Sequence, residues 1–133
     1  MTTLVIALLT LTVLYLAGRT LAWLRGAPEP GDITYHFGSW IGRLVARMSD
    51  NPLGNWKLTL GRHCFVRGHE ITSESRAHEF SHSLDMHRLS IPVAVAQCLY
   101  QYARYGYRNA PVEVVARKFA TMSAEQFPSL SVR

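Results

Sequence analysis

The chain of 133 residues carries a formal net charge of +5, and two of its residues are cysteines. A chain of this length forms at most one small domain beside a membrane segment. The basic residues are scattered among apolar ones and match no nucleic-acid-binding motif, so we expect no nucleic acid as a partner. Cys64 and Cys98 form no C-x-x-C pair, so we interpret them as free thiols in a reducing compartment.

An uncharged, mostly apolar segment opens the chain and extends to Leu24 if Arg19 reaches along the helix toward the interface. A helix over Thr2–Leu24 would be about 34 Å long, which is enough to cross a bilayer. No Lys or Arg precedes the segment, which favours a transmembrane helix over 1–25 rather than a cleaved signal peptide. Arginines flank only its C-terminal side, so the positive-inside rule predicts a single-pass protein with its N-terminus outside and its domain in the cytoplasm.

Residues 26–34 contain two prolines and two glycines, which predict a linker to a domain over 35–133. The next segment, 35–48, has apolar residues at helical intervals of three and four. Such a helix lies either at the membrane interface, in contact with lipid, or against the core of the domain, and the pattern leaves both open. Its apolar positions are Phe37, Trp40, Ile41, Leu44, Val45 and Met48.

After a turn at 51–55, two short segments rich in alternating, β-branched and aromatic residues predict strands over Trp56–Leu60 and His63–Arg67. The two residues between them, Gly61 and Arg62, make a β-hairpin the simplest connection.

Three helices are expected after the hairpin. The first lies within 69–91, where neither Pro nor Gly interrupts the chain. The second, over 92–105, is too short to cross a membrane and is either buried or in contact with the bilayer surface. The third covers Pro111–Met122, and the tail over 123–133 shows no periodicity. The expected fold is therefore a mainly helical α+β domain with a small β-hairpin, tethered by one N-terminal transmembrane helix.

The first of these helices contains the pattern H-E-x-x-H at His78, Glu79 and His82. Residues four apart on a helix share one face, so the two imidazoles can bind one Zn²⁺. Glu79 is placed beside the metal, where it can accept a proton from a water molecule. The alternative interpretation is two surface histidines and a solvated glutamate on an amphipathic helix.

A catalytic zinc site needs a third protein ligand. The metzincin arrangement would place a histidine six residues after His82, but this position is Arg88. Glu113 is the only acidic residue between Asp85 and Glu125, and one helix and a turn separate it from the motif. We therefore predict Glu113 as the third ligand, against the simpler interpretation that it only complements a helix dipole.

The stretch His78–Lys118 resembles a small zinc-metallopeptidase-like family that is related to the gluzincins and often labelled a domain of unknown function. Its members read H-E-x-x-H, then an apolar helix, then G-Y-R-x-x-P-x-E-x-x-A, which corresponds to Gly106–Ala116 here. The hairpin over 58–67 is similar to the strands that precede the motif helix in that family. The chain departs from the family at Ala110, usually Asn, and at Val115, often acidic.

The resemblance implies a zincin-like domain that hydrolyses peptides with a water molecule at Zn²⁺. Glu79 would act as the general base and then pass the proton to the leaving amine. Tyr105, Tyr107 and Arg108 are the available donors toward the oxyanion, and Tyr107 is the catalytic candidate among them. The edge of the hairpin would align an extended peptide substrate by strand addition.

A second hypothesis belongs to another class of protein. The chain would be a catalytically silent, single-span accessory subunit that uses a peptidase-like fold to scaffold a larger membrane complex, respiratory or photosynthetic. Its aromatic residues and the small residues of the helix over 92–103 would contact membrane lipid and other membrane-protein subunits. Zinc content and the loss of peptide cleavage on substitution of Glu79 distinguish the two hypotheses.

Overall fold

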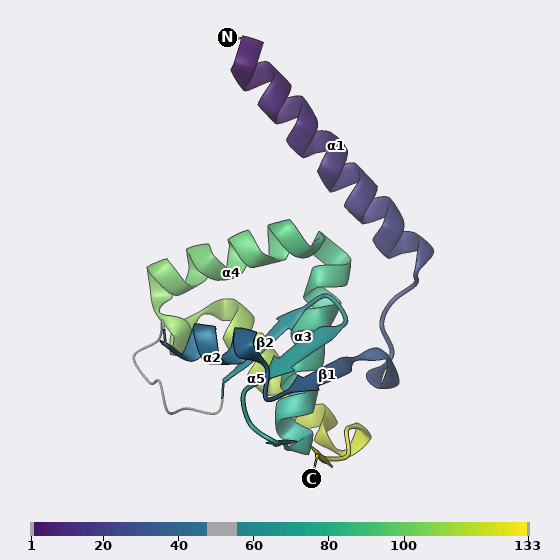
Figure 1. The fold of residues 1–133 in the computed structure, drawn as a ribbon, viewed down its shortest axis with the longest axis vertical. Coiled ribbons are helices and arrows are strands. Elements are labelled where there is room, and N and C mark those ends of the chain that lie inside the picture. Colours follow the sequence, from purple (N-terminus) through teal and green to yellow (C-terminus); the bar gives the residue numbers. More distant parts are fainter. Residues whose placement is uncertain (1, 48–55, 133) are drawn as a thin grey trace.

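The structure, a computed structural model, describes residues 2–47 and 56–132. A long helix, α1 (Thr2–Leu24), projects from a mainly helical domain that also contains two small sheets (Figure 1). The expected mainly helical α+β class is confirmed. The predicted turn at 51–55 and Met48 lie outside the described residues.

The larger sheet has the strand order β1-β3-β2. The expected hairpin forms from β2 (Lys57–Leu60) and β3 (His63–Val66), which pair antiparallel around a turn at Gly61. Gly61 has a φ of +62°, a left-handed conformation that glycine adopts without steric cost. β1 (Thr34–Phe37) pairs parallel with β3, so β2 lies at one edge of the described sheet.

The helix predicted over 35–48 is wrong in its first part, because residues 34–37 form β1 and α2 (Trp40–Arg47) begins only at Trp40. Gly38, with a φ of +61°, changes the direction of the chain between β1 and α2. Its N–H donates a hydrogen bond to the carbonyl of Gly68. Trp40 and Leu44 are 66% and 48% exposed. These two side chains therefore do not pack into the core, whereas Phe37 of β1 packs against it. Contact of α2 with lipid stays a prediction.

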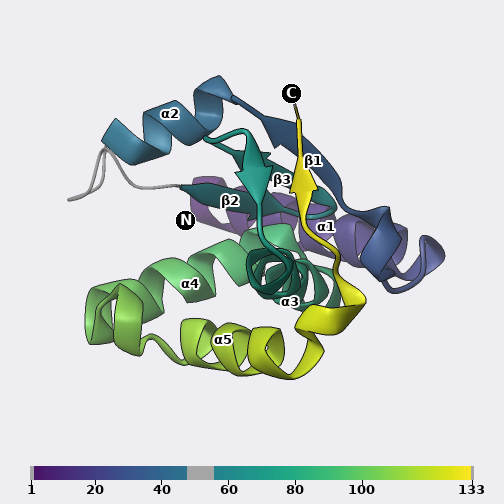
Figure 2. The same cartoon turned by 90° about the horizontal axis from the view of Figure 1, so that it is seen from below.

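The three helices expected after the hairpin are present as α3 (Ser73–Leu89), α4 (Ile91–Tyr105) and α5 (Pro111–Ser123). Thr72 caps α3, since its hydroxyl accepts a hydrogen bond from the N–H of Ser75 at 3.2 Å. α3 crosses the middle of the domain between the sheet and α5 (Figure 2). This central position puts the H-E-x-x-H residues between the sheet and the C-terminal helices.

Short elements complete the domain. Two of them are 3₁₀ turns, η2 (Tyr107–Asn109) between α4 and α5 and η3 (Ala124–Gln126) after α5. The tail, which shows no periodicity, closes the fold by pairing β5 (Leu130–Ser131) antiparallel with β4 (Glu70–Ile71). The predicted linker over 26–34 also contains a 3₁₀ turn, η1, formed by its proline, glycine and aspartate. The pairing of β5 with β4 places the C-terminal tail beside the start of α3.

The core lies between the sheet, α3 and the C-terminal elements. Its centre is a group of three phenylalanines, in which the ring centroids of Phe80 and Phe127 are 5.1 Å apart and those of Phe80 and Phe119 are 6.1 Å apart. Phe127 is only 1% exposed. Apolar burial of this kind is the main source of stability in small domains. It holds α3 and α5 together, which positions the site described below.

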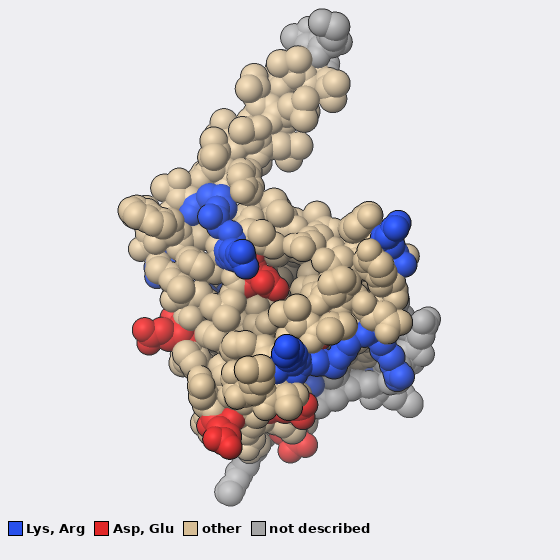
Figure 3. All heavy atoms as spheres, turned by 180° about the vertical axis from the view of Figure 1, so that it is seen from behind, with Lys and Arg blue, Asp and Glu red and all other residues tan. Residues whose placement is uncertain are grey.

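α1 stands apart from this core. Its segment Leu4–Leu24 is long and apolar enough to span a membrane, and none of that window is buried inside the structure. The surface of α1 carries no charged side chains until its base, where basic side chains gather (Figure 3). At the base, Arg19 donates hydrogen bonds to the carbonyls of His87, at 3.1 Å, and Arg88, at the end of α3. A signal sequence near the N-terminus meets the same criteria of length and composition.

Candidate metal centre

Two imidazoles of α3 meet on one side of the helix. His78 and His82 are four residues apart, and their Nε2 atoms are 3.1 Å apart. Their rings are held edge to face with centroids 4.8 Å apart. Both side chains are largely buried, with exposed fractions of 16% and 11%. The helical spacing therefore brings two nitrogen ligands to one point, as the sequence predicts.

The carboxylate of Glu113 comes from the first turn of α5 and lies against both rings. Its Oε2 is 3.2 Å from Nε2 of His78, and its Oε1 is 3.4 Å from Nε2 of His82. Glu113 is 1% exposed, and its Oε2 makes no hydrogen bond of regular geometry in the described structure. A buried carboxylate with each oxygen this close to a ring nitrogen normally needs either protons or a cation between the groups.

These three side chains fit a divalent metal ion. Two ligands bound at 2.0–2.1 Å to a tetrahedral Zn²⁺ are about 3.3 Å apart. The measured separations of 3.1, 3.2 and 3.4 Å are close to that value, although they involve both oxygens of Glu113. The donor set of two imidazoles and one carboxylate is also one that binds zinc in catalytic sites. The residues present can therefore hold a metal without large rearrangement.

The electrostatics of the three groups are coupled. Burial alone would raise the pKa of Glu113, but contacts with His78, His82 and Tyr102 lower it well below its ordinary value. Burial alone would lower the pKa of His82, but the contact with Glu113 and the charge of Glu79 raise it. The cluster thus keeps its carboxylate ionised, which is the form that binds a cation.

Tyr102 supports Glu113 from α4 and was not singled out by the sequence. Its hydroxyl donates a hydrogen bond to Oε1 of Glu113 at 2.5 Å. Burial and the neighbouring Glu113 raise the pKa of Tyr102, so it remains a donor at neutral pH. Its position within an apolar helix, eleven residues before Glu113, gave no local signal, because the contact depends on how α4 packs against α5.

Glu79 lies beside the ligands and is held by a second residue that sequence reasoning missed. Thr59 donates a hydrogen bond from its hydroxyl to Oε2 of Glu79 at 2.8 Å. Thr59 is 3% exposed and Glu79 is 7% exposed. Strand alternation would have put this threonine on the solvent side, opposite Leu58 and Leu60. The structure places it against α3 instead, where it orients the carboxylate of Glu79.

An open cleft of about 1150 Å³ lies over His78, His82 and Glu113, with β2 along one side and α4 and η2 along the other. Tyr107 and Arg108 line this cleft, and Tyr105 is not among the lining residues. The ring of Tyr107 is 5.4 Å from that of Tyr102, and burial, together with the charge of Glu113, raises the pKa of Tyr107. Of the three predicted oxyanion donors, Tyr107 and Arg108 are therefore placed beside the site.

Comparison with protein-family models, curated proteins and solved structures found no match to this chain. The resemblance to the metallopeptidase-like family therefore stays a prediction from the two sequence motifs.

Proposed function

We propose that this protein is a membrane-anchored, zinc-dependent hydrolase of the zincin type that cleaves peptide bonds. One observation carries the proposal. Nitrogen atoms of His78 and His82 and the carboxylate of Glu113 converge with their ligand atoms within 4.8 Å of one another, at the floor of an open cleft. Glu79 lies beside them with its carboxylate held in place by Thr59.

Each residue at the site has a separate role in the proposed hydrolysis. When bound, Zn²⁺ would supply a Lewis acid that polarises the scissile carbonyl and lowers the pKa of water. Glu79 accepts the proton of the attacking water and delivers it to the leaving amine, while Thr59 holds its other oxygen. Tyr107 lines the cleft with a hydroxyl that stays protonated and can donate to the developing oxyanion. Tyr102 keeps the carboxylate of Glu113 in place.

The substrate class follows from the walls of the cleft. Residues 56–60, which include the edge strand β2, form one wall, and the strand has a neighbour on only one side in the described sheet. An extended peptide can pair with such an edge by main-chain hydrogen bonds, which would carry its backbone across the metal-binding residues. Leu58, Val95 and Leu99 line the same cleft and favour apolar side chains in the bound peptide.

We further propose that α1 crosses the membrane once and that the domain lies on the cytoplasmic side. Arg19 and Arg25 at the base of α1 and the absence of charge over residues 2–18 support this orientation. The cleft would then act on peptides or membrane-protein segments that reach the cytoplasmic surface.

Metal content and cleavage together test the proposal. The full-length protein, purified in detergent, should contain about one equivalent of zinc by elemental analysis and should cleave a quenched fluorogenic peptide library. His78→Ala should lose both the metal and the cleavage. Glu79→Gln should keep the metal and reduce cleavage by about 10²–10⁴-fold, the usual contribution of a general base. His69→Ala, at an exposed histidine, is the matched control.

The alternative is the silent accessory subunit, which exposed apolar residues on α4 and α5 favour. Leu99, Val115 and Met122 are 62%, 57% and 75% exposed. Under this alternative the wild-type protein binds zinc but cleaves no peptide, and Glu79→Gln changes nothing. Such a result, or a wild-type protein without metal, would reject the peptidase proposal.

A further inference from the structure

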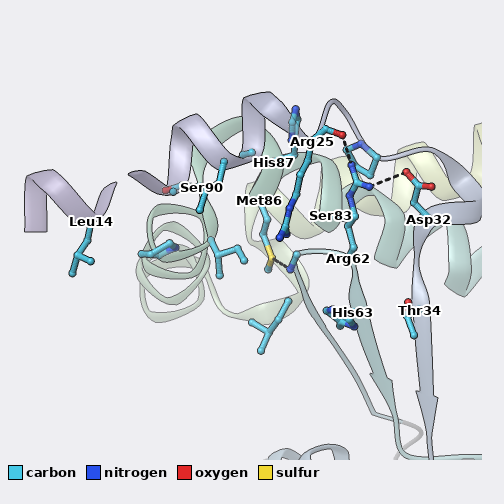
Figure 4. Close-up of a pocket in the computed structure, with 18 residues that line it drawn as sticks. Leu14, Arg25, Asp32, Thr34, Arg62, His63, Ser83, Met86, His87 and Ser90 are labelled. Carbon is cyan, nitrogen blue, oxygen red and sulfur yellow. Dashed lines mark hydrogen bonds and ion pairs between the residues drawn. The ribbon is translucent and has the colours of Figure 1, made fainter. Parts of the chain in front are cut away.

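A second hollow lies where α1 meets the domain. This junction pocket has a volume of about 490 Å³ and is enclosed by the base of α1, the turn between β2 and β3, the end of α3 and the start of α4 (Figure 4). A volume of this size is within the range of small-molecule binding sites. Its lining includes Leu14, Leu21, Arg25, Ser83, Ser90 and Ile91.

Two buried hydroxyl groups line the pocket without a partner. Ser83 and Ser90 are 1% and 4% exposed, and neither Oγ has a hydrogen bond within the described part of the chain. Most buried polar side chains in proteins are paired, so two hydroxyls without a partner beside one cavity are free to pair with a polar ligand or a water molecule. Ser90 also has a φ of +75°, a conformation that a residue other than glycine rarely adopts and that tends to occur at functional positions.

The charge of the pocket is positive. Arg62 forms an ion pair with Asp32 at 3.2 Å and donates to the carbonyls of Arg25 and Gly26, so its charge is largely balanced. Arg25 adds a second guanidinium to the lining, whereas Asp32 is the only acidic residue that lines it in the described structure. α4 begins at the pocket with Ile91, and the N-terminal end of a helix favours negative charge. These features together select an anion.

The remaining wall is apolar and belongs to α1. Leu14 and Leu21 of α1 line the pocket, and these residues are 64% and 56% exposed. A pocket that holds an anion at one end and opens along an apolar helix at the other matches an amphiphile with a charged headgroup. A soluble phosphate would use the polar end alone and would leave the apolar wall in contact with water.

We propose that the junction pocket binds an anionic phospholipid of the cytoplasmic leaflet. Its phosphate would lie among Arg25, Ser83 and Ser90, and an acyl chain would follow Leu14 and Leu21 along α1. This inference rests on the proposed membrane span of α1, but it does not depend on the peptidase activity. Bound lipid would fix the angle between α1 and the domain and so hold the cleft at a set distance from the membrane.

Native mass spectrometry of the full-length protein in detergent, with added lipid, tests the proposal. The protein should retain one phosphatidylglycerol per chain and bind it at least about tenfold more tightly than phosphatidylcholine, the usual size of a charge-assisted contact. Arg25→Gln and Ser83→Ala should each weaken this binding, with the arginine change costing about tenfold. Arg104→Gln makes the same change of net charge at an exposed site on the far end of α4 and should leave it unchanged.

Any of four results would overturn the proposal. Equal retention of both lipids, or an equal effect of Arg25→Gln and Arg104→Gln, would indicate general attraction to the surface. Binding of glycerol 3-phosphate as tightly as the lipid would indicate a site for a soluble anion. Release of the protein from membranes by alkaline carbonate would refute the span itself, and this result leaves zinc content and cleavage unaffected.

Discussion

The cleft over His78, His82 and Glu113 and the junction pocket differ in whether their buried hydroxyl groups have hydrogen-bond partners. They share α3, and both are lined by Leu60 and Met86. In the cleft, the hydroxyls of Thr59 and Tyr102 each donate to a buried carboxylate, at 2.8 and 2.5 Å. In the junction pocket, the hydroxyls of two buried serines have no partner in the described structure.

This difference separates two ways to build a binding site. Paired hydroxyls hold ligand and base side chains in place before any substrate arrives, which is what catalysis requires. Unpaired hydroxyls stabilise nothing in the free protein and gain a partner only when a ligand binds. Removal of a hydroxyl should therefore damage the cleft at once, whereas in the junction pocket its effect should depend on the ligand.

The largest effect is expected at the carboxylate that Tyr102 supports. Glu113→Gln replaces a charged ligand by a neutral amide and should weaken zinc binding by more than about 100-fold, since even supporting residues contribute 10–100-fold. Competition with a fluorescent zinc chelator measures this affinity. Glu125→Gln, at an exposed acid, provides the control. Unchanged affinity would remove Glu113 from the ligand set and with it the metal centre proposed here.

Tyr102→Phe removes only the hydroxyl that donates to Glu113. Zinc affinity should fall by about 10–100-fold, because the carboxylate loses the hydrogen bond that orients it. The same chelator competition applies. Tyr100→Phe, on the same helix but 63% exposed, should have no effect. Equal affinities for the two variants would show that Tyr102 plays no supporting role.

Thr59→Val keeps the shape of the side chain but removes the donor to Glu79. We expect zinc content to stay at the wild-type level and kcat for peptide cleavage to fall by about tenfold, because the base is no longer oriented. Thr59→Ser should restore most of the rate, since it restores the hydroxyl. A fall in zinc content rather than in kcat would contradict a role through Glu79.

The smallest effect is expected in the junction pocket. In detergent without lipid, Ser83→Ala should leave the free energy of unfolding unchanged or raise it by up to about 1 kcal/mol, because it removes a buried hydroxyl without a partner. Thermal unfolding followed by circular dichroism checks this. A loss of stability larger than about 1 kcal/mol would mean that the hydroxyl is paired in the free protein, and the contrast with the cleft would fail.

The part of the site that lies on one helix could be predicted from the sequence, because the 3.6-residue period alone places His78 and His82 on one face. Glu113 was reached by elimination among few acidic residues, and the structure places its carboxylate against both rings. The supporting residues could not be reached in this way. Thr59 is the clearest case, because strand alternation predicts a solvent-facing side chain where the structure buries one.

The same limit explains the error over 35–48. Phe37 and Trp40 fit a helical period, but Gly38 adopts a left-handed conformation between them, and pairing with β3 makes Phe37 part of a strand. Parallel pairing of β1 with β3 joins segments separated by more than 20 residues, so no local sequence pattern predicts this pairing.

By itself, the sequence determined the apolar helix at the N-terminus, the hairpin, the C-terminal helices and the pair of imidazoles, because each depends on residues close together in the chain. The tertiary structure alone decided which side chains support the carboxylates and where the junction pocket forms. Those features depend on the packing of α3 against β2, α4 and α1, and that packing is set by the burial of the whole core rather than by any one segment.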